Sequence, residues 1–175
     1  QNLYANRIWY ATANKGLGFI EKDSLYGNLP NEILPNTRIK VLEEDEKGYL
    51  WLGTANQGMY HLYLYDKKFN LKNTRKALSS DDINFILADG TDSLWLWTVS
   101  CLDRVNLDFE RNFTDLRHFG RKEGLEDVEI NQHAAFLKAG RLWLGANTGF
   151  SIYQAQSNAA ENAGPRIYLE QVRLF

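Results

Sequence analysis

One short pattern of apolar and polar positions recurs along the chain. It consists of a bulky apolar residue, a Trp, another apolar or aromatic residue, a small residue and a short polar turn that usually contains Gly. The copies lie at 8–17, 50–59, 94–102 and 142–150. Their leading residues, Trp9, Trp51, Trp95 and Trp143, are 42, 44 and 48 positions apart. A period in the forties is typical of the four-stranded blade of a β-propeller.

Each copy is flanked by further strand-like segments. Before the second, third and fourth Trp lie 38–45, 82–89 and 129–138, each followed by a short turn that contains Gly. This order of strand, turn and strand predicts a hairpin. After the pattern come an aromatic-rich stretch, 59–65 in the second unit, and a weaker one, 69–71 or 116–119. Four strands per unit are therefore expected.

Burial of the Trp side chains explains why such units must stack. A large apolar side chain contributes roughly 1.5–3 kcal/mol when it is fully buried. The small residue after the Trp lets a neighbouring sheet approach, and the later Gly supplies a positive φ at the turn. A single sheet cannot cover both of its faces, so successive sheets cover each other. The sequence predicts an all-β fold of about four four-stranded antiparallel blades, a partial β-propeller.

The third unit departs from the pattern. Trp97 replaces the small residue, and the shortened turn 99–101 places Cys101 where Gly is expected. We interpret this as a blade with altered packing, and a special site is the alternative.

Composition excludes several classes of partner. The 175 residues carry a formal charge of −2, which gives no electrostatic signature for nucleic acid or for an anionic membrane. No apolar run of 18 residues occurs, so no direct membrane insertion is expected from this segment. The one cysteine excludes an internal disulfide.

Motif searches predict neither catalysis nor a bound group. His61, His118 and His133 show no metal-ligand spacing, and Cys101 has no consistent partner in sequence, so no metal site is expected. Hydrolase, phosphate-loop and metalloprotease motifs are missing, and no cofactor is predicted. The acidic run 43–46 is interpreted as a solvated turn. A propeller lyase or glycosidase, with clustered acids at the channel mouth, is the weaker alternative.

A binding site is expected on one rim of the propeller, near its central channel. The turns between second and third strands, and the loops that precede first strands, meet there. Asn, Gln, Asp and Arg can bond to sugar hydroxyls, and a Trp can stack on a sugar ring. The alternative is that these polar residues are ordinary turn residues. The candidates are Asn14, Lys15, Arg38, Asn56, Gln57, Asp81, Trp97, Asn131 and Asn147.

The copy from Ile39 to Met59 resembles the two-component regulator propeller repeat, whose Asp, Gly, Leu-Trp and Gly-Thr positions it matches almost in full. The resemblance is also specific in the fourth unit, moderate in the first and weak in the third. Gly124-Leu125 is similar to the segment that precedes the last blades in such proteins, and the tail 164–175 is similar to the first strand of the small β-sandwich that follows the propeller there. Residues 1–160 are therefore expected to form blades, and 161–175 a linker and the first strand of a following module, or a ring-closing strand.

This resemblance implies a function. It implies the periplasmic sensor region of a bacterial hybrid two-component histidine kinase, anchored in the inner membrane and responding to a glycan. The alternative is a scaffold or protein-interaction propeller without a small ligand. Four blades are few for a closed ring, so the chain is expected to associate with the remaining blades or with a second copy of itself.

Overall fold

The computed structural model describes residues 7–13, 16–29, 34, 37–64, 71–74, 78–99, 101–123, 125, 130–147 and 149–154. Within these ranges the chain forms fourteen β-strands and one 3₁₀ turn, Arg121–Glu123. In the same part of the chain, no helix has the length and apolar character needed to cross a membrane. The proposed module at 161–175 lies outside the described residues.

The strands form four antiparallel sheets, and each sheet is a meander of consecutive strands. The first contains β1 (Arg7–Thr12), β2 (Gly16–Glu21) and β3 (Ser24–Leu29). The second contains β4 (Ile39–Glu44), β5 (Tyr49–Thr54), β6 (Met59–Tyr63) and β7 (Leu71–Thr74). The third contains β8 (Ile83–Ala88), β9 (Ser93–Thr98), β10 (Leu102–Leu107) and β11 (Phe113–Phe119). The fourth contains β12 (Ile130–Lys138), β13 (Arg141–Ala146) and β14 (Gly149–Gln154).

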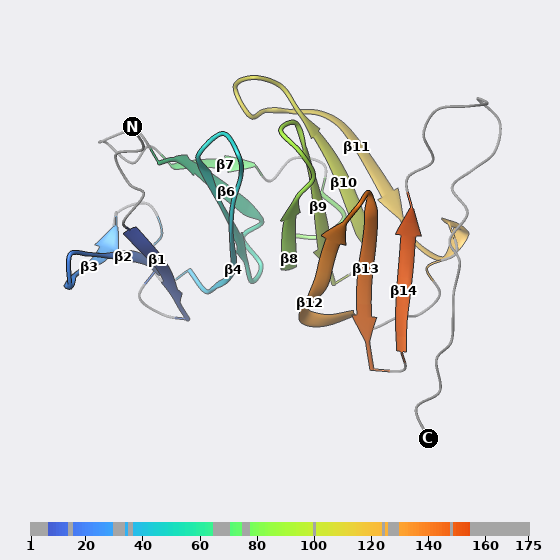
Figure 1. The fold of residues 1–175 in the computed structure, drawn as a ribbon, viewed down its shortest axis with the longest axis horizontal. Helices are drawn as coiled ribbons and strands as arrows, with labels where there is room; N and C mark the ends of the chain where they lie inside the picture. Colours follow the sequence, from blue (N-terminus) through green and yellow to red (C-terminus); the bar gives the residue numbers. More distant parts are fainter. Residues whose placement is uncertain are drawn as a thin grey trace.

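The predicted all-β, blade-like architecture is confirmed. The sheets follow one another in chain order across the molecule (Figure 1). Two of them have four strands and two have three among the described residues, where four were predicted for each. Three apolar clusters lie between successive sheets. Their members include Leu17 with Leu52, Trp51 with Leu94, and Trp95 with Leu142.

The repeated Trp residues occupy equivalent places in their sheets, but their burial differs. Trp51 is 0% exposed and Trp95 is 1% exposed, and each packs toward the sheet that follows it. Trp9 and Trp143, in the first and last sheets, are only partly buried. Trp143 belongs to the last of the described sheets, so no later described sheet covers it, whereas Trp9 packs at the edge of the cluster between the first and second sheets.

Close approach of the second and third sheets explains the small residue two positions after Trp51. A Cβ atom added to Gly53 would lie 2.5 Å from a methyl carbon of Val41 and 2.8 Å from one of Ile83, in the next sheet. No real side chain tolerates such distances, so the predicted role of this residue is confirmed. Gly58, at the following turn, has the predicted positive φ of 73°.

An Asp carboxylate accompanies each central Trp, buried in the case of Asp45 and partly exposed in the case of Asp89. Trp51 Nε1 donates a 2.9 Å hydrogen bond to Asp45, and Trp95 Nε1 donates a 3.1 Å bond to Asp89. Asp45 Oδ1 also accepts bonds from the backbone N–H groups of Lys47 and Tyr49, which closes the turn. Asp45 is only 5% exposed, so the solvated-turn interpretation was wrong at this residue. The carboxylate instead satisfies the indole N–H that burial removes from water.

Arg111 ties the third sheet to the second. It lies in the turn between β10 and β11, is 0% exposed, and places Nη2 2.7 Å from Asp45 Oδ2 as an ion pair. Its Nη1 donates to the backbone oxygen of Thr91, and its guanidinium lies 5.2 Å from the ring centre of Tyr49. A buried charge pair of this kind is sensitive to loss of one partner, because the other charge stays buried.

We predict that Arg111→Met destabilises the protein by about 3–5 kcal/mol, because Asp45 then stays buried without its cation. Urea unfolding followed by Trp fluorescence measures the change. The matched control is Arg117→Met, since the side chain of Arg117 is 74% exposed in its pair with Asp115 and contributes little. Equal losses of unfolding free energy in the two variants would contradict the assigned role.

Candidate functional site: a polar rim and a cysteine–aspartate–histidine cluster

One rim of the central sheets is held together by backbone hydrogen bonds. Ala55 N–H, in the turn between β5 and β6, donates to the oxygen of Arg38 just before β4. Gly58 N–H, at the end of the same turn, donates to the oxygen of Asp81 just before β8. Val99 N–H in the third sheet makes the corresponding bond to Asp82. Turns and pre-strand loops from neighbouring sheets therefore lie side by side, as predicted from the sequence.

Three of the predicted ligand residues meet on this rim. Arg38, Asn56 and Asp81 are exposed and belong to the segments that these backbone bonds join. Asn56 has a φ of 70°, a left-handed backbone conformation that Asn adopts more readily than most residues. Below them, Lys40 Nζ donates to the side chains of Asp82 and Asn84 and so connects β4 with the start of the third sheet.

Two of the predicted ligand-binding residues make contacts within the protein instead. Trp97 is only 9% exposed and belongs to the cluster between the third and fourth sheets, so it presents no ring face to a ligand. It fills the space that a Gly would leave there. Gln57 is half-buried, and its Oε1 accepts bonds from the hydroxyls of Thr37 at 2.9 Å and Tyr60 at 3.3 Å.

The remaining candidates lie apart or outside the described residues. Asn131 and Asn147 are exposed on the fourth sheet, at the start of β12 and in the turn between β13 and β14. Asn14 and Lys15 lie outside the residues that the structure describes.

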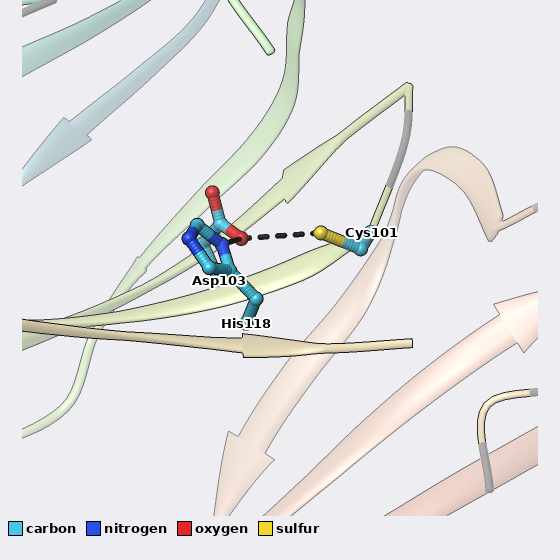
Figure 2. A group of neighbouring side chains, drawn as sticks. All are labelled: Cys101, Asp103 and His118. Atoms are coloured by element: carbon cyan, nitrogen blue, oxygen red, sulfur yellow. Dashed lines mark hydrogen bonds and ion pairs between the residues drawn. The ribbon is translucent and has the colours of Figure 1, made fainter. Parts of the chain in front are cut away.

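The third sheet contains a cluster that the sequence spacing did not reveal. β10 and β11 pair so that Asp103 lies opposite His118. Cys101, two residues before Asp103, is held by the turn, where its N–H donates to Thr98 Oγ1 and its oxygen accepts from Thr98 N–H. Donor atoms of Cys101, Asp103 and His118 all lie within 4.8 Å of one another. Figure 2 shows His118 and Cys101 directed toward the Asp103 carboxylate.

Asp103 is the centre of this cluster and is 0% exposed. Its Oδ1 lies 2.7 Å from His118 Nδ1 and accepts a bond from Cys101 Sγ at 3.3 Å. Its Oδ2 accepts two 2.9 Å bonds, from the backbone N–H and from the hydroxyl of Ser79. The carboxylate orientation is therefore fixed from the side opposite to Cys101 and His118.

Burial raises the pKa of the Cys101 thiol to about 11, and the neighbouring Asp103 carboxylate acts in the same direction. At neutral pH the sulfur is therefore protonated and donates to Asp103. The His118 side chain is 50% exposed, so solvent reaches the cluster from that side. The signal in the sequence was Cys101 in the place of a turn Gly, but only the pairing of β10 with β11 supplies the other two residues.

His61 is the second histidine that folding places in a special environment. It is 2% exposed, on β6, with ring centres 4.6 Å from Trp51 and 5.8 Å from Tyr49. Burial, and then the positive charges of Lys72 and Arg111, lower its pKa to about 4, while Asp45 acts in the opposite direction. His61 is therefore a packed strand residue, and its ring is neutral at pH 7.

Comparison with known proteins identifies the repeat. Residues 33–56 match the family model described as two component regulator propeller. This segment is similar to one repeat of that propeller family. The matched segment contains Arg38, Lys40, Asp45, Trp51 and Asn56, so this repeat provides both the buried Asp–Trp pair and part of the polar rim. No curated protein sequence matches the chain significantly.

Solved structures confirm the fold of the chain that carries this propeller repeat. It is similar to the extracellular domain of a hybrid two-component system from B. thetaiotaomicron, with a TM-score of 0.68 and 18% identity over 97% of this chain and 22% of that one. The extracellular domain of a one-component system from the same organism gives 0.62 and 16%, over 88% and 22%. A luciferin-regenerating enzyme gives 0.67 and 15%, over 97% and 59%. The chain thus spans about a fifth of the two signalling domains.

We predict that acidification destabilises the protein through His61. Because the folded-state pKa of about 4 lies below the ordinary value of 6.5, the unfolded chain binds the proton more strongly. The stabilisation is complete above about pH 6.5 and is lost as the pH falls toward 4. Between about pH 7 and pH 5 the free energy of unfolding should fall by about 2 kcal/mol from this residue.

Urea unfolding of the wild-type protein and of His61→Leu at the two pH values measures this contribution. The exposed His133 stays in both proteins, so the difference between their pH slopes reports His61 alone. A His61→Leu variant with the same pH slope as the wild type would contradict the prediction.

Proposed function

We propose that the chain is part of the extracytoplasmic sensor propeller of a two-component signalling protein and that its polar rim binds a glycan. The matched propeller repeat supports the first part, as does the shared fold with extracellular domains of signalling proteins. In this proposal the segment lies in the periplasm as part of a hybrid histidine kinase. Its role is binding, since the rim presents polar groups rather than an activated nucleophile.

The side-by-side arrangement of Arg38, Asn56 and Asp81 is the observation that carries the glycan proposal. A guanidinium, an amide and a carboxylate can together donate to and accept from several sugar hydroxyls. They stand on turns fixed by backbone bonds, so little conformational freedom is lost when a ligand binds. With Trp97 buried, this rim recognises its ligand by hydrogen bonding rather than by stacking through that residue.

A protein-interaction propeller is the second candidate, and the open face of the fourth sheet favours it. Trp143 and Phe150 lie there 5.7 Å apart between ring centres, and Phe136 is 50% exposed. Together with Ala134 and Gly145 they line a shallow hollow of about 300 Å³. At the other end of the chain, Ile8 and Leu25 are 67% and 70% exposed.

We propose that this open face is covered by a further propeller blade, and that in the isolated chain the first sheet of a second copy takes that place. Within the chain, the side of each central sheet that carries Trp51 or Trp95 packs on an apolar face of the next sheet. Trp143 is the equivalent residue of the last sheet, and Ile8 lies on the side of the first sheet opposite to Trp9. Such a contact would repeat the interfaces already present.

We predict that an oligosaccharide from a panel of plant and host glycans raises the melting temperature of the chain, and that Arg38→Ala removes the shift. Differential scanning fluorimetry against the panel measures this. The matched control is Glu46→Ala, an exposed residue beyond the opposite end of β4, which should leave the shift unchanged. Absence of a shift with every glycan, together with capture of a protein partner, would favour the protein-interaction propeller.

We predict that the isolated chain associates through its end sheets and that Trp143→Lys makes it monomeric. A charge in this apolar face must be desolvated in the complex, which weakens association by at least tenfold. Multi-angle light scattering over a range of concentrations measures the mass, with Arg117→Glu, on an exposed strand of the third sheet, as control. A stable monomer at high concentration in the wild-type chain would defeat this proposal.

A further inference from the structure

The Cys101, Asp103 and His118 cluster occupies positions that carry no metal-ligating side chains in the preceding sheet. Cys101 is equivalent to Gly58, because the oxygen of each accepts from the backbone N–H of a Thr that ends the preceding strand, Thr98 or Thr54. The registers then make Asp103 equivalent to Tyr60 and His118 equivalent to Asn73. In the second sheet the equivalent residues are therefore Gly58, Tyr60 and Asn73.

The second and third sheets therefore share the same backbone framework, but only the third sheet carries a sulfur, a carboxylate and an imidazole at these three positions. We propose that Cys101, Asp103 and His118 form a binding site for a divalent transition-metal ion of the zinc type. These three donor types are the ones that Zn²⁺ selects in proteins. The cluster is independent of the proposed glycan rim.

The three donor atoms all lie within 4.8 Å of one another, so they can reach one tetrahedral ion after a small shift of the imidazole. Metal bonds of about 2.0–2.3 Å place neighbouring donors roughly 3.3–3.7 Å apart. Asp103 Oδ1 lies 3.3 Å from Cys101 Sγ and 2.7 Å from His118 Nδ1. The imidazole must move away from the carboxylate by roughly half an ångström, and its half-exposed position on β11 leaves room for this.

Metal binding replaces two hydrogens without leaving a polar atom unpaired. The ion takes the place of the Cys101 S–H hydrogen and of the hydrogen between His118 Nδ1 and Asp103 Oδ1. The thiol proton passes to solvent, and the neutral imidazole carries its proton on Nε2, in a side chain that is 50% exposed. Asp103 Oδ2 keeps both bonds from Ser79, which orient the ligand as outer-shell groups do in known metal sites.

The arrangement leaves one coordination position for water or an external ligand. Cys101 is half-buried and His118 half-exposed, so the fourth position of a tetrahedron faces solvent. Three protein ligands with an open position are typical of zinc sites that bind or activate a further molecule.

Co²⁺ titration of the reduced, metal-free 175-residue chain tests the site. The chain has a single cysteine, so a thiolate-to-cobalt absorption band in the near ultraviolet can come only from Cys101. We expect this band together with visible bands of tetrahedral Co²⁺, saturating at one equivalent and abolished by Zn²⁺. Absence of the thiolate band in the wild-type chain would overturn the proposal.

Two substitutions separate the site from non-specific binding. Cys101→Ser should abolish the thiolate band, and His118→Gln should weaken Co²⁺ binding by at least tenfold. His133→Gln, which removes an exposed histidine of the fourth sheet, should leave affinity unchanged. Circular dichroism and melting temperature, measured without metal, check that each variant is folded. If Cys101→Ser is unstable, the test of the metal site depends on His118→Gln, because His118 is half-exposed and its substitution disturbs the fold less. Unchanged affinity in His118→Gln would show that the cluster is only a hydrogen-bonding group.

Discussion

The structure depends on the need of each sheet to hide its apolar side against another sheet. Trp51 and Trp95 meet this need in the centre of the chain, where both are almost completely buried against the sheet that follows. Each contributes an area that no single sheet could cover by itself. The spacing between sheets follows from this contact, and Gly53 marks a point where the second and third sheets approach closely. The positions of the rim turns are set in turn by the sheets that carry them.

Burial of an indole creates a second constraint, since its N–H must find an acceptor away from water. The Asp six residues earlier supplies it in both central sheets, as Asp45 for Trp51 and Asp89 for Trp95. The same Asp45 carboxylate also closes its own hairpin turn and pairs with Arg111 of the next sheet. One residue therefore connects turn geometry, core packing and the contact between sheets, which explains why Asp and Trp occur together in this repeat.

A regular framework allows local chemistry to change without a change of fold. In the third sheet, Trp97 takes the place of a Gly and fills the space beside the fourth sheet. Cys101 takes the place of a second Gly, the one in the turn. Because hydrogen bonds of the strands fix the backbone, the substitution at the turn brings a sulfur beside Asp103 and His118 rather than distorting the sheet. In the polar rim of the second sheet, a fixed backbone likewise presents side chains that differ from those of the third sheet.

The repeat, the strand order and the roles of the Trp, Gly and turn positions could be predicted from the amino-acid sequence alone. They depend on local geometry and on a spacing that recurs in every unit. Asp45 was placed in the right turn but interpreted as solvated, since its cation Arg111 lies 66 positions away and nothing local announces it. Trp97 and Gln57 were predicted to contact a ligand. In the structure, Trp97 is instead buried against the fourth sheet, and the Gln57 side chain accepts a hydrogen bond from Thr37. The cluster around Asp103 likewise exists only through the register of β10 with β11, because side-chain distance across a sheet is set by strand pairing and not by separation along the chain.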